Sequence, residues 1–122
     1  MSSASGAPQP SDVCRLDRAL RRLQNDRGLL IDLAKIFFED RAKIWDELKA
    51  GLQRSEIEVV RRSAHTLKGL VSNFDAGPAE RGCLAVEQAA ANGNFTDVAN
   101  LLPELQHRLN DVEDYLRTEL GI

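Results

Sequence analysis

The sequence has few of the residues that mark several common classes of protein. Among 122 residues there are two cysteines, Cys14 and Cys83, which form neither a Cys-x-x-Cys pair nor a cluster with histidine. We therefore expect no disulfide framework and no structural zinc site. No apolar run approaches the roughly 18–20 residues that cross a bilayer. The first residues lack the basic and apolar regions of a signal peptide, so we expect a cytoplasmic protein.

Charge and strand-forming residues are also limited. Lysine and arginine number 16 against 19 aspartates and glutamates, a net charge of −3, so the chain has no overall basic character for binding nucleic acid. Aromatic residues make up 5%, and no run alternates between polar and apolar residues over the length of a strand. A length of 122 residues fits one domain. These features favour a single all-α domain.

Residues 1–11 are small, polar and proline-rich, and we interpret them as a flexible N-terminal tail. Residues 12–122 form the predicted domain. Apolar residues at three- and four-residue spacing predict five helices, at about 12–24, 26–51, 56–74, 78–92 and 95–120. Four long amphipathic helices with short connections predict an antiparallel four-helix bundle, with the short first helix as an addition.

Several residues mark where helices begin and end. Ser55 and Glu58 match a capping box, in which the serine binds the third amide and the glutamate reaches back. Asn25 or Asp26 is expected to cap the helix before it. Pro103 falls inside the last helix and should kink it or mark a tight first segment. The remaining signals are Pro78 at the first turn of the fourth helix and Asn92-Gly93 at its end.

The helix predicted at 26–51 has an unusually wide apolar surface. Its main apolar face consists of Leu29, Leu30, Leu33, Phe37, Ile44 and Leu48. A second stripe consists of Ile31, Phe38, Trp45 and Leu52. We expect the first helix to cover the second stripe, with docking of a partner as the alternative.

The helix predicted at 56–74 carries His65 on its polar side. At about 100° per residue, His65 lies roughly 130° from the centre of the arc formed by the apolar side chains. These are Ile57, Val60, Ala64, Leu67, Val71 and Phe74. His65 should therefore point into solvent. Its neighbours one turn away include Arg61, Arg62 and Lys68, with no carboxylate among them on this helix, which argues against a metal ligand.

The three cations favour a neutral imidazole, which is a competent nucleophile, and would stabilise a phosphoryl group attached to it. Lys68 is the best placed of them. Gly69 costs the helix about 1 kcal/mol relative to alanine. Its position beside His65 suggests clearance for a bulky group, and close packing of another helix is the alternative.

Motifs of other chemistries are missing. The sequence contains no phosphate-binding loop, no paired carboxylates around His65 and no Ser/His/Asp set. His107 lies on the polar side of the last helix and is interpreted as a surface histidine. The residues thus describe a phosphoryl carrier that has no kinase or nucleotide site of its own and receives its phosphoryl group from another protein.

The segment Ala64-His65-Thr66-Leu67-Lys68-Gly69 resembles the His-x-Leu-Lys-Gly motif of histidine-containing phosphotransfer (HPt) domains. Asn73-Phe74 follow at the expected distance, and Cys83-x-x-Val86-Glu87 resembles the pattern on the family's next helix. Residues 29–52 resemble the preceding helix, so the similarity covers about residues 26–120.

This resemblance implies a four-helix bundle that carries a phosphoryl group between receiver-domain aspartates in a two-component phosphorelay. His65 would be phosphorylated, Lys68 would support the phosphoryl group, and Gly69 would leave room for it. The chain would need no cofactor of its own, since the partner supplies Mg²⁺ and the aspartate. The expected partners are response-regulator receiver domains and a hybrid sensor histidine kinase. We expect a monomer that binds neither nucleic acid nor membrane.

Two departures from the family pattern occur near the motif. Asp75 stands where glycine is common, which would alter the end of the helix, and Leu70-Val71 replace small residues after the motif glycine. Partner docking is expected around His65, with Ile57, Arg61, Arg62, Leu70 and Ser72 as candidates. Two alternative functions are an interaction module that binds or sequesters a response regulator without carrying phosphate, and a histidine- or metal-dependent hydrolase.

Overall fold

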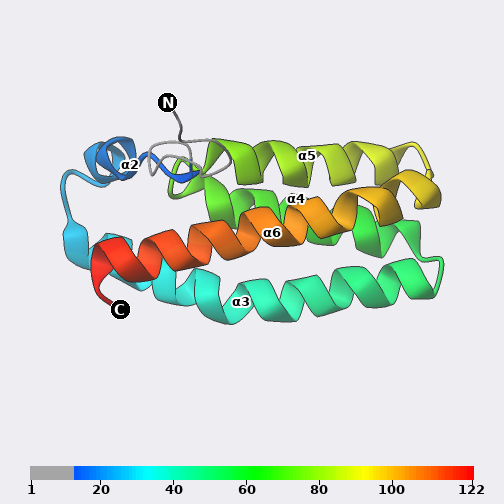
Figure 1. Ribbon diagram of the computed structural model, residues 1–122, viewed down its shortest axis with the longest axis horizontal. Helices are drawn as coiled ribbons and strands as arrows, with labels where there is room; N and C mark the ends of the chain where they lie inside the picture. The colour runs from blue at the N-terminus through cyan, green and yellow to red at the C-terminus, as the bar shows by residue number, and fades with distance from the viewer. Residues whose placement is uncertain (1–12) are drawn as a thin grey trace, which may run out of the picture.

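The computed structural model describes residues 13–122, and the predicted N-terminal tail at 1–11 lies outside them. The described part contains five helices, named by their bounds: α2 (Leu16–Arg22), α3 (Arg27–Gln53), α4 (Ile57–Ser72), α5 (Gly77–Ala91) and α6 (Phe95–Leu120). Figure 1 shows α3 to α6 lying side by side as a bundle, with α2 at one end. The predicted fold class is confirmed.

The four long helices close around one core. α4 packs between α3 and α5, α5 packs against α6, and α6 returns to α3. The Phe37 and Phe74 rings meet edge to face in this core, with centroids 5.8 Å apart. At the other end of α3 and α4, a Cβ added to Gly51 would lie 2.9 Å from Val59 Cγ1, so only glycine allows the two helices to approach this closely. No helix between residues 13 and 122 combines the length and apolar character needed to cross a membrane.

The predicted capping box is wrong. The residue that precedes α4 is Glu56, no side chain caps the helix, and Glu58 binds Arg61 instead. Ser55 ends the preceding helix: it has a φ of 58°, its N–H donates to Leu52 O, and the N–H of Glu56 donates to Gly51 O. This pair of bonds is the Schellman arrangement that closes a helix. The connection is so short that Ser55 terminates α3 and is not available to begin α4.

The other helix boundaries agree more closely with prediction. The Asp26 carboxylate accepts the Leu29 N–H at 2.9 Å, so Asp26 and not Asn25 caps α3. α6 continues through Pro103 without interruption. α2 is shorter than predicted and begins at Leu16, because the Arg15 N–H donates to the carbonyl oxygens of Phe74 and Asp75.

The two apolar stripes of α3 are arranged differently from expectation. Leu29 of the main face is exposed, and so is Ile36, one heptad further along α3. Phe38 and Trp45 of the second stripe border a groove between α3 and α6, where the guanidinium carbon of Arg117 lies 4.0 Å from the centre of the Phe38 ring. The last helix, and not the first, therefore covers this part of the stripe.

Candidate functional site

The histidine of α4 points into solvent, as predicted. Its side chain is 63% exposed. The apolar face of the same helix is buried, and Val60, Ala64, Leu67 and Val71 have no accessible surface. The amphipathic pattern of α4 therefore places a reactive ring on the outside of a rigid helix.

Glu87 of α5 joins His65 to Lys68. His65 Nδ1 lies 2.9 Å from Glu87 Oε2, and Lys68 Nζ donates to Glu87 Oε1 at 2.9 Å. The Glu87 side chain is 17% exposed, so this carboxylate is partly withdrawn from water between its two partners. The three side chains form one hydrogen-bonded cluster across α4 and α5.

The charge on Glu87 determines which nitrogen of His65 is free. The hydrogen bond from Lys68 lowers the pKa of Glu87 below its ordinary value of 4.5. Partial burial acts in the opposite direction, and the hydrogen bond with His65 lowers the pKa further. An ionised carboxylate only accepts hydrogen bonds, so Nδ1 must donate the proton. In the neutral ring the other nitrogen, Nε2, then has the free lone pair. The cluster thus presents Nε2 as the nucleophilic atom.

The sequence did not place Glu87 beside His65. The sequence predicts no carboxylate one turn from His65, and the carboxylate that contacts His65 comes from the neighbouring helix. In the sequence, Glu87 stands out only as the last residue of the Cys83-x-x-Val86-Glu87 pattern. The pairing needs the register between α4 and α5, which no local spacing encodes.

Two of the three cations expected around His65 are paired with carboxylates. Lys68 is bound to Glu87, and Arg61 is held by Glu58, with its Nη2 2.8 Å from Glu58 Oε1. Arg62 borders the groove between α3 and α4. Two of the three positive charges are therefore already paired in the unphosphorylated protein.

Gly69 faces open space. A Cβ built at this position would meet no atom within 4 Å. Close packing of another helix, which was the alternative explanation for this glycine, is excluded within residues 13–122. The prediction that Gly69 provides clearance beside His65 agrees with this geometry.

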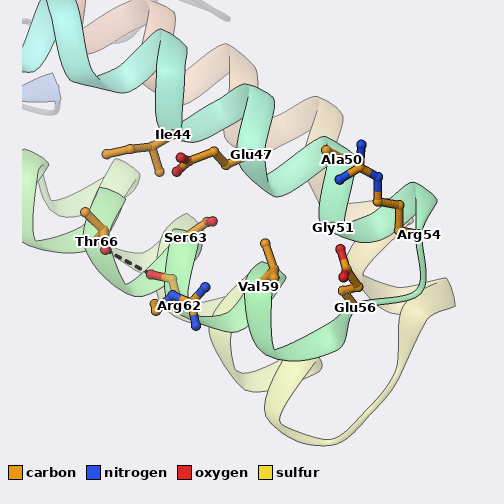
Figure 2. A pocket seen from close by; sticks show the side chains of 10 residues that line it. All are labelled: Ile44, Glu47, Ala50, Gly51, Arg54, Glu56, Val59, Arg62, Ser63 and Thr66. Carbon is orange, nitrogen blue, oxygen red and sulfur yellow. Dashed lines mark hydrogen bonds between the residues drawn. The ribbon is translucent and has the colours of Figure 1, made fainter.

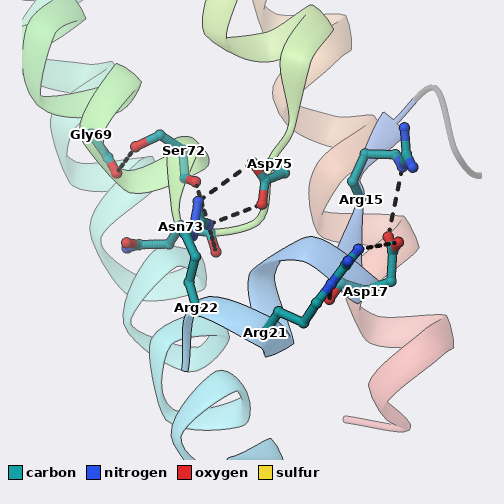
Figure 3. A network of polar contacts seen from close by, with 8 residues as sticks. All are labelled: Arg15, Asp17, Arg21, Arg22, Gly69, Ser72, Asn73 and Asp75. Carbon is teal, nitrogen blue, oxygen red and sulfur yellow. Dashed lines mark hydrogen bonds and ion pairs between the residues drawn. The ribbon is translucent and has the colours of Figure 1, made fainter. Parts of the chain in front are cut away.

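The end of α4 is held by α2 through a polar network (Figure 3). The Arg22 guanidinium donates to the carbonyl oxygens of Ser72 and Asn73, each at 3.2 Å, and lies 3.0 Å from an Asp75 carboxylate oxygen. Asp75 has a φ of 49°, the left-handed conformation that glycine adopts most easily. Asp75 thus takes a backbone conformation that suits glycine and adds an ion pair.

The predicted docking residues are spread along α4. Ile57 and Leu70 are half-buried against the core, and the Ser72 hydroxyl donates to Gly69 O at 2.9 Å. Ile57 and Ser72 belong to the first and last turns of the helix, roughly 22 Å apart at 1.5 Å per residue. His65 lies between them.

A groove of about 410 Å³ runs between α3 and α4 (Figure 2). Its lining combines apolar, charged and hydroxyl side chains: Ile44, Glu47, Ala50, Gly51, Arg54, Glu56, Val59, Arg62, Ser63 and Thr66. The Thr66 hydroxyl donates to Arg62 O at 3.0 Å. His65 is not part of this lining.

Other titratable residues lie apart from the cluster or are buried. Cys14 and Cys83 are free thiols, and burial raises the pKa of each to about 12. His107 is an exposed residue of α6, 3.7 Å from Asp111, as a surface histidine should be. Among residues 13–122, no three histidine, cysteine, aspartate or glutamate side chains converge as a metal site.

Comparison with known proteins agrees with this site. A family model described as the Hpt domain matches residues 32–115. Among solved structures, the histidine-containing phosphotransfer protein B (HptB) from Pseudomonas aeruginosa PAO1 is similar, with a TM-score of 0.76 and 25% sequence identity over 95% of this chain and 97% of that chain. The comparison with curated proteins found no match.

The family match covers most of the chain and includes α4, α5 and the whole His65–Lys68–Glu87 cluster. Proteins of this family carry phosphoryl groups and interact with receiver domains of two-component systems. The chain belongs to the Hpt domain family and is a histidine phosphotransfer intermediate of two-component signalling.

Proposed function

We propose that His65 is the residue that carries the phosphoryl group, accepting it from a receiver-domain aspartate and passing it to another receiver domain. One observation carries the assignment: Glu87 binds Nδ1, which leaves Nε2 free on a ring that is 63% exposed. His107, the other histidine, lies 3.7 Å from Asp111, which is too far for a hydrogen bond that would orient its ring in the same way.

The transfer is a displacement at phosphorus. The Nε2 lone pair of His65 attacks the phosphorus of the aspartyl phosphate, and the bond from phosphorus to the aspartyl oxygen breaks, returning its electron pair to the carboxylate. The ring becomes positively charged and keeps its proton on Nδ1, where Glu87 stabilises it. Reversal of the same step returns the phosphoryl group to an aspartate.

Lys68 and Gly69 act on the phosphoryl group in different ways. Lys68 Nζ, on the turn after His65, is close enough to contribute a positive charge while it remains near Glu87. Gly69 has open space where a side chain would stand, so the phosphoryl group and the partner's loops can approach the ring. Neither residue takes a proton in the reaction.

We assign the remaining requirements of the reaction to the partner. The receiver domain supplies the aspartate and Mg²⁺, and the chain acts as a monomeric, cytoplasmic carrier with no cofactor and no kinase or nucleotide site of its own. It binds neither nucleic acid nor membrane. A hybrid sensor histidine kinase is one source of a donor receiver.

The receiver is proposed to dock around His65 on α4 and the adjoining surface of α3. Ile57, Arg61, Arg62, Leu70 and Ser72 are the candidates on α4. The exposed Leu29 and Ile36 add apolar surface on α3. Ile36 precedes Phe37, whose ring packs on Phe74 just after α4, so this apolar surface lies toward the end of α4 that carries Leu70 and Ser72.

The test is phosphoryl transfer from a phosphorylated receiver domain. We expect label on the full chain that is acid-labile and base-stable, as a phosphoramidate should be, and loss of this label in His65→Gln. Because His65 is exposed, the His65→Gln substitution should leave the fold intact, and circular dichroism checks this. His107→Gln is the matched control and should still accept label. Transfer to His65→Gln, or binding of receivers without transfer, would contradict the proposal.

A further inference from the structure

Arg61 lies one helical turn before His65 and has an exposed acidic partner. Its Nε is 3.0 and 3.2 Å from the two Glu58 oxygens, and its Nη2 is 2.8 Å from one of them. The side chains are 39% and 67% exposed. Ion pairs in contact with water contribute little stability. A stronger anion near Arg61 could therefore displace Glu58.

Helix geometry brings such an anion close to Arg61. Side chains on a helix lean toward its N-terminus, so the His65 ring leans over the turn that carries Arg61. At about 100° per residue, Arg61 and Lys68 lie about 40° and 60° from His65 in the same direction around α4. This is the direction of α5, from which Glu87 reaches Lys68. Hydrogen bonding to Glu58 raises the pKa of Arg61, and the charge of Glu87 adds to this effect.

We propose that Arg61 is a second ligand of the phosphoryl group, held by Glu58 in the unphosphorylated protein and released to the phosphoryl oxygens once His65 is modified. The inference rests on the phosphorylation of His65 proposed above. A phosphoryl group carries about −1.5 to −2 charges and three acceptor oxygens, against one charge on Glu58. The planar guanidinium binds such a group through two parallel hydrogen bonds.

Arg61 can approach the phosphoryl group more freely than Lys68 can. Lys68 is shared with Glu87, and Glu87 must keep its own contact with Nδ1 while the ring is positively charged. Lys68 therefore cannot move far toward the phosphoryl group without weakening the contact that orients the ring. Arg61 can leave its partner without disturbing the ring. Among the hydrogen bonds of residues 13–122, its partner Glu58 makes none with His65, Lys68 or Glu87.

Arg62 provides the matched control. It has the same charge as Arg61 and is also exposed, but it lies about 60° from His65 in the opposite direction around α4. Its side chain borders the groove toward α3 (Figure 2). If positive charge near His65 acts only in a general way, replacing either arginine should change the phosphoryl group equally. If Arg61 contacts the phosphoryl group directly, replacing Arg61 should have the larger effect.

The experiment loads the full chain chemically with potassium phosphoramidate and follows the phosphoryl group by ³¹P NMR as pH changes. We expect Arg61→Gln to raise the second pKa of the phosphoryl group by about half a unit, the effect of one charge roughly 5 Å away in a water-like medium. Arg62→Gln should raise it less. Equal shifts in the two variants would overturn the proposal.

A second measurement reports on Arg61 itself. The ¹H–¹⁵N signal of its Nε should move when the wild-type chain is loaded, because the guanidinium leaves Glu58. An unchanged signal would contradict the exchange. Because loading is chemical, both readouts remain valid if no receiver transfers to His65. Failure of receiver transfer would count against the proposed function, and failure of these two readouts would count against the role of Arg61.

Discussion

Glu87 serves two neighbours with the two oxygens of a single carboxylate, and this sharing makes the site sensitive to acid. Its contacts with His65 and Lys68 are both 2.9 Å long. Protonating the carboxylate would remove its charge and one of its acceptor positions at once. The orientation of the nucleophilic ring therefore depends on Glu87 remaining ionised.

The lowered pKa of Glu87 predicts a definite pH dependence of stability. Because the pKa in the folded chain is below the ordinary value of 4.5, the contribution of Glu87 is present above 4.5 and is lost as pH falls through the folded pKa. Urea unfolding should show wild type more stable than Glu87→Gln at neutral pH, with the difference narrowing as pH falls below 4.5. A constant difference down to the lowest pH would contradict the assignment.

Replacing Gly69 should change the stability of the protein and its rate of phosphoryl transfer in opposite directions. Replacing it with alanine places a methyl group in open space and removes the helix penalty of glycine, so the free energy of unfolding should rise by up to about 1 kcal/mol. The same methyl group narrows the approach to His65, and the rate of transfer from a receiver should fall. Denaturant unfolding and transfer kinetics on one preparation check both effects. If the alanine variant is more stable and accepts the phosphoryl group at the wild-type rate, Gly69 does not act by leaving room beside His65.

At the scale of single helices, the α3–α4 connection is decided by Ser55. Its φ of 58° is a conformation that costs a residue with a side chain roughly 1–2 kcal/mol and costs glycine little. Only Arg54, Ser55 and Glu56 separate the last residue of α3 from the first residue of α4. Closure of α3 uses the backbone of Ser55, and no side chain caps α4.

Ser55→Gly should therefore stabilise the protein by about 1 kcal/mol. A serine that capped α4 would behave differently, because replacing a capping serine with glycine costs a few tenths of a kcal/mol. Thermal unfolding of wild type, Ser55→Gly and Ser55→Ala distinguishes the two arrangements. A loss of stability in Ser55→Gly would instead support Ser55 as the capping residue of α4.

The helices were predictable from sequence because each carries its own periodic pattern. α4 and α6 match the expected limits to within two residues, and the core face of α4 was correct. Residues whose role depends on another helix were not predictable in this way. Glu87 needed the α4–α5 register, and Phe38 needed the position of Arg117 on α6. His65 could be found because its motif and its outward direction both lie within one helix.

At the scale of the whole molecule, α2 lies at one end of the bundle, where half-buried Leu16 and Leu20 and several polar contacts attach it. It buries one residue fully, Ala19, whereas α6 buries seven. Arg22 holds the carbonyl oxygens of Ser72 and Asn73, and the Arg15 N–H reaches the connection that follows α4 (Figure 3). Segments with little apolar burial open without unfolding the rest of a domain.

This attachment predicts two levels of stability within one chain. Amide hydrogen exchange should show α2 opening at a lower free energy than the buried positions of α4 and α6, such as Leu67 and Leu109. Arg22→Ala should speed exchange in α2 and at the end of α4, since it removes contacts to Ser72 O, Asn73 O and Asp75 together. Exchange at Leu67 and Leu109 should change little.

Arg18→Ala is the control for that experiment, because Arg18 is an exposed arginine of the same helix. If both variants speed exchange equally, the loss of charge on α2 accounts for the effect and the contacts to α4 do not. If instead Arg22→Ala speeds exchange throughout the bundle, α2 belongs to the cooperative core. Selective acceleration in Arg22→Ala would place the mobile part of the molecule in α2 and at the end of α4, while the His65–Glu87 contact stays on the stable part.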